Sequence, residues 1–404
     1  MKLLLRGPVV ASARLRVKRD FQPAAGPFAL TPSAGAFDAR RHVLVMNTNT
    51  FTAVLAGMIG AACAAAWAGE PAAPAPPKRY PTMGQVERLS PELDALIAPD
   101  AQIEKLAGGF EWAEGPVWEK KSNTLLFSDV PRNVVFQWRE GVGTRDYLYP
   151  SGFTGPRARE GLDREQGSNG LTFDAQGRLV LCQHGDRRVA RWEGGRFHTL
   201  AAYYQYRRFN SPNDLVYAAN GNLYFTDPTY GLPRDPNNPE RRLGQELLFS
   251  GVYLLRPHGE VVALVKDLTF PNGVALSPQG KILYVAVSDP NNPVIMSYPV
   301  REDGTLDRGV VFFDAKPLAA AGRKGLPDGL KVDYQGNLFA TGPGGVLVIS
   351  PRGKLLGIIN TGELTANCAF GDADGSRLYM TADHYLCRIQ TLTRGQGAWR
   401  KKKS

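Results

Sequence analysis

The sequence predicts an all-β protein built as a six-bladed β-propeller, and three observations support this fold class. One outline recurs six times along the chain: a polar residue, a short apolar strand, a turn, and a second strand that begins with leucine. The polar residue, called the leader below, lies 10 or 11 residues before that leucine in every copy. Successive copies start roughly 40 to 60 residues apart, a period typical of radially repeated or stacked units rather than of an open sheet.

The copy at residues 326–341, LPDGLKVDYQGNLFAT, shows this outline most plainly. Its leader Asp328 precedes an alternating apolar strand, a Gln-Gly turn and a second strand, which together predict a β-hairpin with an oxygen-bearing side chain at its mouth. Six such hairpins with unequal insertions fit a propeller in which the first strand of each hairpin lines a central channel. A lone strand at 103–106 is expected to close the ring beside residues 386–392.

The repeats place the propeller at residues 101–393. Residues 1–68 are expected to be a targeting region, in which 46–68 have the apolar run and small-residue cleavage site of a secretory signal peptide. This run is too weakly hydrophobic for a stable membrane span. Residues 1–45 are either a targeting extension or the result of a start codon assigned too early, and the second is favoured. The protein is therefore expected in the periplasm or outside the cell.

Two shorter segments flank the repeats. Residues 69–100 are expected to form a Pro/Ala-rich linker followed by a short helix that begins at Ser90-Pro91. Residues 394–404 form a basic tail. The net charge of +10 comes from the two ends, because residues 1–68 contribute +6 and the tail contributes +5, which leaves the rest of the chain near −1. The high net charge is therefore no argument for nucleic-acid binding, and none is expected.

Several catalytic and metal-binding signatures are absent from the sequence. It contains no H-E-x-x-H, G-x-S-x-G, Walker, G-x-G-x-x-G or EF-hand motif. Its five histidines show no ligand spacing, and its four cysteines form neither a metal site nor a disulfide framework. Cys368 and Cys387 fall in one repeat and are expected to be small buried residues, with a disulfide between them as the alternative. Serine-triad and zinc-finger functions are disfavoured.

If the six hairpins are radially equivalent, their leaders converge at one mouth of the channel. The leaders are two carboxylates and four carboxamides: Glu114, Asn169, Asn213, Asn272, Asp328 and Asn367. A ring of oxygen donors without cysteine or histidine suits Ca²⁺ better than Zn²⁺. The alternative is turn chemistry, since Asn and Gly tolerate positive φ. Six leaders in register, two of them acidic, favour the cation site.

A cation at this mouth would polarise a carbonyl or phosphoryl oxygen. Asp328 is the candidate catalytic base because its short side chain is held close to the Pro-Asp-Gly turn, although binding the cation would weaken it as a base. Two insertions, 150–167 and 227–250, should overhang the mouth, since the second strand of each hairpin returns to that face. His184 and Tyr230 follow such second strands and are candidate substrate contacts.

Four groups of motifs occur in a fixed order over residues 104–390: EGPVW, SPNDL with YFTDPTYG, FPNGVALSP with LYVA, and LPDGLKVDYQGNLF. They resemble the gluconolactonase, regucalcin (senescence marker protein) and luciferin-regenerating enzyme family. The resemblance implies a six-bladed propeller that hydrolyses sugar lactones to aldonic acids with one divalent metal, often calcium, with Zn, Mn and Mg as alternatives. It assigns the metal to Glu114, Asn213, Asn272 and Asp328, the base to Asp328, and a substrate or supporting contact to Asn169.

One departure from the family bears on the substrate. Regucalcin-like members have an Arg that touches the sugar two residues before the third-repeat Asn, and this chain has Ser211 there, which leaves the particular sugar open. Three functions therefore stay in view: a metal-dependent lactonase, which is favoured, a phosphotriesterase that uses the same ligands, and a non-catalytic propeller that binds calcium, a sugar or a partner protein. The oligomeric state is not indicated.

Overall fold

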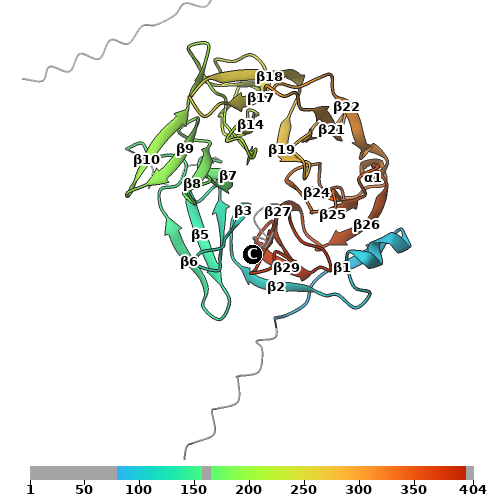
Figure 1. The fold of residues 1–404 in the computed structure, drawn as a ribbon. Coiled ribbons are helices and arrows are strands. Elements are labelled where there is room, and N and C mark those ends of the chain that lie inside the picture. The colour runs from blue at the N-terminus through green and yellow to red at the C-terminus, as the bar shows by residue number, and fades with distance from the viewer. Residues whose placement is uncertain (1–79, 157–164, 397–404) are drawn as a thin grey trace, which may run out of the picture. The chain divides into compact units, whose positions relative to one another are not determined.

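The computed structural model describes residues 80–156 and 165–396, which are almost entirely β-structure. Six antiparallel sheets surround a central axis, and the first strand of each repeat is the innermost strand of its sheet (Figure 1). These inner strands contact one another in a closed ring, in the order β3, β7, β13, β19, β23, β27 and back to β3. The predicted six-bladed propeller is confirmed. The predicted targeting region, most of the linker and the tail beyond residue 396 lie outside the described residues.

The first three blades follow the chain from the channel outward. Blade 1 contains β3 (Ala113–Glu119), β4 (Thr124–Asp129), β5 (Val134–Arg139) and β6 (Gly143–Leu148). Blade 2 contains β7 (Ser168–Phe173), β8 (Leu179–Gln183), β9 (Arg188–Glu193) and β10 (Arg196–Ala201). Blade 3 contains β13 (Leu215–Tyr217), β14 (Leu223–Asp227), β17 (Ser250–Leu255) and β18 (Val261–Leu268).

The remaining blades complete the ring. Blade 4 contains β19 (Pro271–Leu276), β20 (Ile282–Val287), β21 (Val294–Pro299) and β22 (Val310–Asp314). Blade 5 contains β23 (Leu330–Val332), β24 (Leu338–Gly342), β25 (Gly345–Ile349), β26 (Leu355–Asn360) and β1 (Gln85–Arg88). Blade 6 contains β27 (Thr365–Gly371), β28 (Arg377–Ala382), β29 (Tyr385–Gln390) and β2 (Ile103–Gly108).

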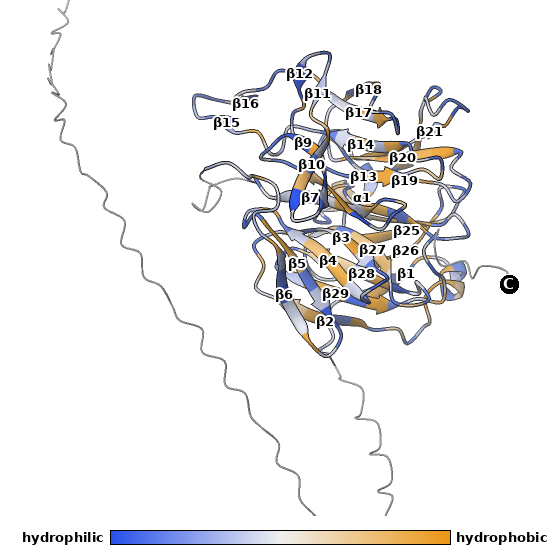
Figure 2. Cartoon of the chain, turned by 60° about the vertical axis from the view of Figure 1, so that its left-hand side comes forward, coloured by the Kyte–Doolittle hydropathy of each residue, from blue (hydrophilic) through white to orange (hydrophobic). Residues whose placement is uncertain are grey.

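Short elements decorate the connections between these strands. Two small hairpins pair β11 (Tyr203–Tyr204) with β12 (Arg207–Arg208) and β15 (Arg234–Asp235) with β16 (Asn238–Arg242). The second hairpin projects from the body of blade 3 (Figure 2). The helical elements are α1 (Lys316–Ala320) and the 3-10 helix η1 (Pro91–Ala95). Among the described residues, none of the helices has the length and apolar character needed to span a bilayer.

The ring is closed as the sequence predicts. Strand β2 pairs antiparallel with β29, with Ile103 opposite Ile389, so the outermost strand of the last blade comes from the N-terminal side of the first. The segment predicted as linker and helix, 69–100, contributes more than expected. Its strand β1 pairs with β26 and adds a fifth strand to blade 5, and Ser90 precedes a 3-10 turn without a side-chain capping bond.

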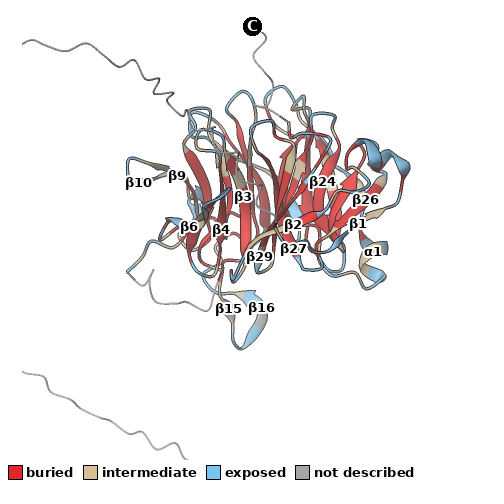
Figure 3. Cartoon of the chain, turned by 90° about the horizontal axis from the view of Figure 1, so that it is seen from below, coloured by how far each residue is buried: buried red, intermediate tan, exposed pale blue. Residues whose placement is uncertain are grey.

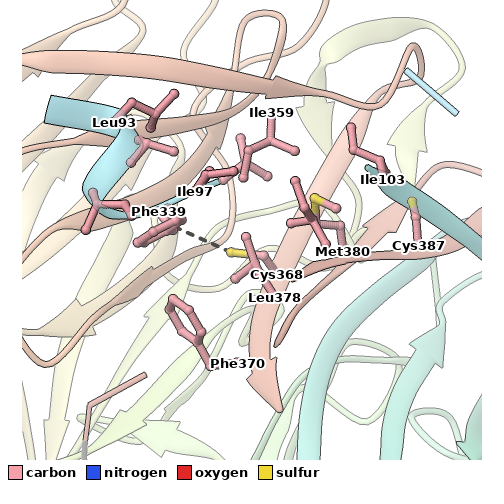
Figure 4. Close-up of a cluster of buried hydrophobic side chains, with 14 of the residues drawn as sticks. Leu93, Ile97, Ile103, Phe339, Ile359, Cys368, Phe370, Leu378, Met380 and Cys387 are labelled. Carbon is pink, nitrogen blue, oxygen red and sulfur yellow. Dashed lines mark hydrogen bonds between the residues drawn. The ribbon is translucent and has the colours of Figure 1, made fainter. Parts of the chain in front are cut away.

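The core lies between the blades, and the strands are buried while the turns are exposed (Figure 3). One cluster joins blades 5 and 6 to residues 83–103, called the N-terminal segment below. It contains Leu93, Ile103, Phe339, Cys368 and Met380 (Figure 4). The described cysteines, Cys182, Cys368 and Cys387, are free thiols buried in such clusters, as the sequence analysis favoured. The N-terminal segment is therefore part of the core rather than an appendage to it.

Ile103→Ala tests this closure. Ile103 is 2% exposed in the cluster, so we expect the substitution to lower the free energy of unfolding by about 2–4 kcal/mol, because it removes buried methyl groups and leaves a cavity. Urea unfolding followed by tryptophan fluorescence measures the change. Leu89→Ala, at a position 53% exposed, is the control and should change little. Equal midpoints for Ile103→Ala and the wild type would contradict closure through β2.

Candidate functional site

The leaders of five repeats line one cavity at a mouth of the channel. Its volume is about 410 Å³. The lining includes the side chains predicted as metal ligands and two of those predicted to contact substrate: Glu114, Asn213, Asn272 and Asp328, with Asn169 and Tyr230. The structure thus brings together six of the seven predicted site residues. The sixth leader, Asn367, lies behind Glu114 and donates a hydrogen bond from Nδ2 to Glu114 Oε2 over 3.1 Å.

Irregular pairing at the start of the inner strands places the leaders at the mouth. The register between the first two strands shifts between Glu114 and Val117 in blade 1, and equivalent shifts occur at the starts of β7, β19 and β27. Such a bulge leaves a residue outside the ladder and re-aims its side chain. Asn169 and Asn272 lie within such bulges, outside the ladder. In blades 3 and 5 the leader stands two residues before the first paired residue, so it is outside the ladder as well. Glu114 and Asn367 stay paired, with Ser128 and Thr381, directly beside their bulges.

Buried hydroxyl groups bond the backbone of two leaders, and of the residue before a third, to the neighbouring blade. Ser128 Oγ donates to the carbonyl of Asn169 over 2.8 Å, and Thr226 Oγ1 donates to the carbonyl of Asn272 over 2.7 Å. Thr341 Oγ1 makes the corresponding bond to the carbonyl of Ala366 over 2.8 Å. These donors have no exposed surface. Because each bond crosses from one blade to the next, the spacing of the leaders around the channel is set by the packing of the blades.

Glu114 is a buried carboxylate in which one oxygen accepts two hydrogen bonds and the other is free to bind a ligand. Its Oε2 accepts hydrogen bonds from the backbone N–H of Gly115 over 2.6 Å and from the amide of Asn367. The pKa of Glu114 is raised to about 7, chiefly by burial and in smaller part by the negative charge of Asp214, against the opposing effect of the two hydrogen bonds. The side chain is 2% exposed. A carboxylate in this setting favours a cation beside it, because burial without a counter-charge is costly.

Asp328 is the second buried carboxylate of the cavity. Its Oδ1 is buried without a hydrogen-bond partner. Burial raises the pKa of Asp328 well above its ordinary value, and the charges of Glu114 and Asp214 add to the shift, whereas a hydrogen bond from Asn272 opposes it. The Asp214 carboxylate accepts hydrogen bonds from the backbone N–H groups of Leu215 and Val274, and so links blades 3 and 4. The charge of Asp214 is thus close enough to raise the pKa of both Glu114 and Asp328 at this end of the channel.

The amides of the cavity present oxygen atoms as well. Asn272 Nδ2 donates to Ser288 Oγ over 3.0 Å, and Ser288 Oγ donates to the carbonyl of Pro327 over 2.6 Å, which fixes the orientation of the Asn272 amide. Asn169 Oδ1 is buried without a partner. An unpartnered buried oxygen is rare in proteins and calls for a ligand, an ion or a water molecule.

This donor set fits a hard divalent cation. It combines two carboxylates with amide oxygens, which Ca²⁺ and Mg²⁺ prefer over the nitrogen and sulfur donors typical of zinc sites. Within the described part of the chain, no three His, Cys, Asp or Glu side chains are grouped for a metal. Half of the candidate ligands, Asn213 and Asn272, are instead asparagines. The unpartnered oxygen of Asp328 and the like-charged pair that it forms with Glu114 are the structural features that such a cation would satisfy.

One wall of the cavity is aromatic and the rim carries another carboxylate. Tyr230 stacks on Phe270 with ring centroids 5.8 Å apart, and Trp112 is also part of the lining. Glu165, from the 150–167 insertion, lines the same cavity. Burial raises the pKa of Glu165, and the charges of Arg234 and Arg242 on the β15–β16 hairpin oppose this shift. Both insertions therefore reach the mouth, as predicted.

His184 is the predicted site residue that the structure does not place in the cavity lining. Its side chain is fully buried, with Nδ1 3.3 Å from the carbonyl oxygen of Glu165 and 3.9 Å from Glu165 Oε2. Burial lowers the pKa of His184 to about 4, so the ring is neutral near neutral pH. His184 is therefore placed to hold the backbone of Glu165 rather than to contact a molecule in the cavity.

The comparisons with known proteins agree with the propeller fold. The family model described as "SMP-30/Gluconolactonase/LRE-like region" matches residues 112–384, which span the channel-lining hairpins of all six blades. The chain belongs to this family. A gluconolactonase from Zymomonas mobilis is 38% identical over 319 residues, which cover 78% of this chain and 88% of the relative.

Solved structures of a gluconolactonase and a regucalcin share the fold. A gluconolactonase from Xanthomonas campestris is 33% identical with a TM-score of 0.65, and the match covers 80% of this chain and 99% of that chain. A calcium-binding regucalcin from Agrobacterium tumefaciens is 18% identical with a TM-score of 0.55, covering 80% of this chain and 99% of that chain, and it shows the fold alone. The family membership predicted from the motifs is confirmed.

The sequence analysis missed four residues of this family member's site. Trp112, Glu165 and Ser288 line the cavity, and Asp214 contributes charge from beside it. Asp214 directly follows a leader, so its position was a usable signal. Glu165 and Ser288 lie outside the repeated outline. The insertion that carries Glu165 was predicted to overhang the mouth, but nothing in the local sequence singles out either residue as part of the cavity lining.

Proposed function

We propose that this protein hydrolyses a sugar lactone to the corresponding aldonic acid at the channel mouth, with one divalent cation, Ca²⁺ first among the candidates. The observation that carries the proposal is the pair of buried carboxylates, Glu114 and Asp328, facing a cavity among amide oxygens. The gluconolactonases from Zymomonas mobilis and Xanthomonas campestris, at 38% and 33% identity over most of the chain, support lactones as the substrate class.

Glu114, Asn213, Asn272 and Asp328 would hold the cation. When bound, it would polarise the lactone carbonyl and stabilise the negative charge that develops on that oxygen. Because the ion accepts six to eight oxygen ligands, four protein side chains leave positions for water and substrate. Zn²⁺, Mn²⁺ and Mg²⁺ are the alternative occupants.

The protein groups supply orientation and proton transfer. Asp328 would take a proton from the attacking water as its oxygen bonds to the carbonyl carbon, and would return a proton to the ring oxygen as the ester C–O bond breaks, which balances water plus lactone against the hydroxy acid. The unpartnered oxygens of Asp328 and Asn169 would receive these hydrogen bonds. The ring of Tyr230, fixed by its stacking on Phe270, would offer a flat apolar surface to the sugar.

Acid release from a panel of compounds tests this function. We expect chelator-treated protein to lose at least about 100-fold in turnover of aldonolactones such as glucono-1,5-lactone, and added Ca²⁺ to restore it. A pH-stat records the acid, with each lactone's spontaneous hydrolysis subtracted. The panel includes diisopropyl fluorophosphate, because a phosphotriesterase would use the same oxygen donors.

The outcomes separate the candidate functions. Lactone turnover that survives complete removal of metal contradicts the proposed metal dependence. Turnover of diisopropyl fluorophosphate alone would replace the lactonase by a hydrolase of the phosphotriesterase type, and binding of Ca²⁺ without turnover of any compound would favour a binding protein. We further propose, from the apolar run within residues 46–68, that the protein is exported to the periplasm or secreted. Fractionation of cells that produce the full chain tests that part separately.

A further inference from the structure

Asn367 occupies the leader position of blade 6, yet it does not line the cavity. Its amide is held in one orientation by its hydrogen bonds. Oδ1 accepts from the backbone N–H of Cys368 over 2.9 Å and from Lys331 Nζ over 3.4 Å, so Nδ2 must be the atom that faces Glu114 Oε2. An amide with two donors on its oxygen and a carboxylate at its nitrogen has no equivalent flipped state.

This contact determines how Glu114 is presented. Oε2 receives two hydrogen bonds, from Gly115 N–H and from Asn367 Nδ2, and both favour the charged carboxylate. Oε1 is the atom left for the cavity. Since Glu114 has three side-chain torsions and is otherwise a flexible ligand, a bond from the adjacent blade selects one orientation of its carboxylate.

The same amide packs against the turn that carries Asp328. A Cβ added to Gly329 would lie 2.0 Å from Asn367 Cγ and 2.1 Å from its Oδ1, so the two residues fit only because position 329 has no side chain. Gly329 N–H also donates to the carbonyl of Ala366 over 2.8 Å. Asn367 therefore touches the backbone beside one buried carboxylate and hydrogen-bonds to the other.

The backbone behind Asn367 is anchored in the core. Cys368 has no exposed surface and its Sγ lies 3.5 Å from the carbonyl oxygen of Phe339 in blade 5 (Figure 4). Thr381 Oγ1 donates to the carbonyl of Asn367 over 3.2 Å. With its main chain bonded on both sides, the side chain of Asn367 has little freedom to follow a displaced Glu114.

We propose that Asn367 is a positioning residue that sets the orientation of Glu114 for cation binding. Because Asn367 also packs against Gly329, it fixes the position of Glu114 relative to Asp328. The inference deepens the proposed function and rests on its cation site. It assigns a role to a leader that neither ligates the cation nor contacts the substrate. Outer-sphere partners of this kind typically contribute 10- to 100-fold to metal affinity.

Calorimetric titration of chelator-treated protein with Ca²⁺, without any substrate, tests this role. We expect Asn367→Leu, which keeps the shape but removes the donor, to weaken Ca²⁺ binding about 10- to 100-fold. Raising the Ca²⁺ concentration should restore lactone turnover in this variant, because the ligands themselves are intact. The matched control is Asn337→Leu. The Asn337 amide also donates to a carboxylate, Asp333 Oδ2 over 2.8 Å, but it belongs to the turn between β23 and β24, so its loss should lower stability alone.

A double-mutant cycle tests the contact with position 329. Gly329→Ala should weaken Ca²⁺ binding about tenfold or more in the wild-type background, because Asn367 must move away from Glu114. In an Asn367→Ala background the new methyl group has room, so the same substitution should have a much smaller effect. Strong non-additivity is the signature of two residues that act through one contact. Asn367→Ala also serves as the smaller replacement if Asn367→Leu does not fold.

Each outcome decides something. Wild-type protein that binds Ca²⁺ with an affinity that Asn367→Leu and Asn367→Ala leave unchanged overturns the inference and leaves the proposed cation site standing. Additive effects in the cycle overturn the coupling through position 329. Wild-type protein that binds none of Ca²⁺, Mg²⁺, Mn²⁺ and Zn²⁺ overturns the cation site and this inference together.

Discussion

Asp328→Asn is expected to lower kcat/KM for lactones about 1,000-fold even at saturating Ca²⁺, and to weaken Ca²⁺ binding about 100-fold because the ligand loses its charge. The asparagine keeps an oxygen at the position of the cation ligand, but it cannot accept a proton from water, and general base catalysis typically contributes 100- to 10,000-fold. Steady-state kinetics at saturating Ca²⁺ and calorimetry on the same preparations measure the two effects separately.

The comparison of these two numbers distinguishes the roles given to Asp328. Activity restored to the wild-type level by excess Ca²⁺ would show that Asp328 is chiefly a ligand and that another group takes the proton. Asp289→Asn is a suitable control, because Asp289 follows β20 at the rim and accepts the N–H of Asn291, a bond that asparagine can also make. Its kinetics should match those of the wild type.

The features predicted correctly from sequence are those that propeller symmetry imposes on every repeat. Each hairpin must have nearly the same length to reach from one mouth of the channel to the other, so the nearly constant distance from leader to leucine, as from Asp328 to Leu338, was visible without a structure. Closure by β2 followed from the same geometry, because the last blade otherwise lacks an outer strand.

The features that sequence did not predict depend on contacts between distant segments. Strand β1 pairs with β26, whose residues lie about 270 positions later. Nothing in its four residues, QVER, indicates which strand it pairs with. Glu165 comes from an insertion outside the repeat, so no internal copy indicates its direction. His184 follows β8 at the rim, but its ring turns into the protein because its Nδ1 lies against the Glu165 carbonyl.

Glu114→Gln is expected to weaken Ca²⁺ binding about 100-fold or more and, in the absence of metal, to stabilise the fold. Glutamine can still accept the bonds from Gly115 and Asn367, so the packing is preserved while the ligand loses its charge. The loss of a direct ligand should cost at least as much affinity as the loss of an outer-sphere partner, which reaches about 100-fold.

The gain in stability follows from the cost of the buried charge. The pKa of Glu114 is raised to about 7 in the folded protein from an ordinary value of 4.5. As the pH rises between these values, the group ionises more readily in the unfolded state, so the free energy of unfolding falls. At pH 8, above both, the full cost is present, and its removal should raise the free energy of unfolding by about 1–3 kcal/mol, since one pKa unit corresponds to about 1.4 kcal/mol. Below about pH 4.5, where the group is protonated in both states, the difference should disappear.

Urea unfolding at pH 8 and near pH 4 in the presence of a chelator measures this difference, and saturating Ca²⁺ should reverse its sign at pH 8. The reversal is the decisive part, because a cation that binds only the folded wild type stabilises it by mass action and has far less effect on the Gln variant. If Ca²⁺ stabilised both proteins equally, Glu114 would not be a ligand. If Glu114→Gln were less stable than the wild type without metal, the carboxylate would have a structural partner that makes its burial favourable.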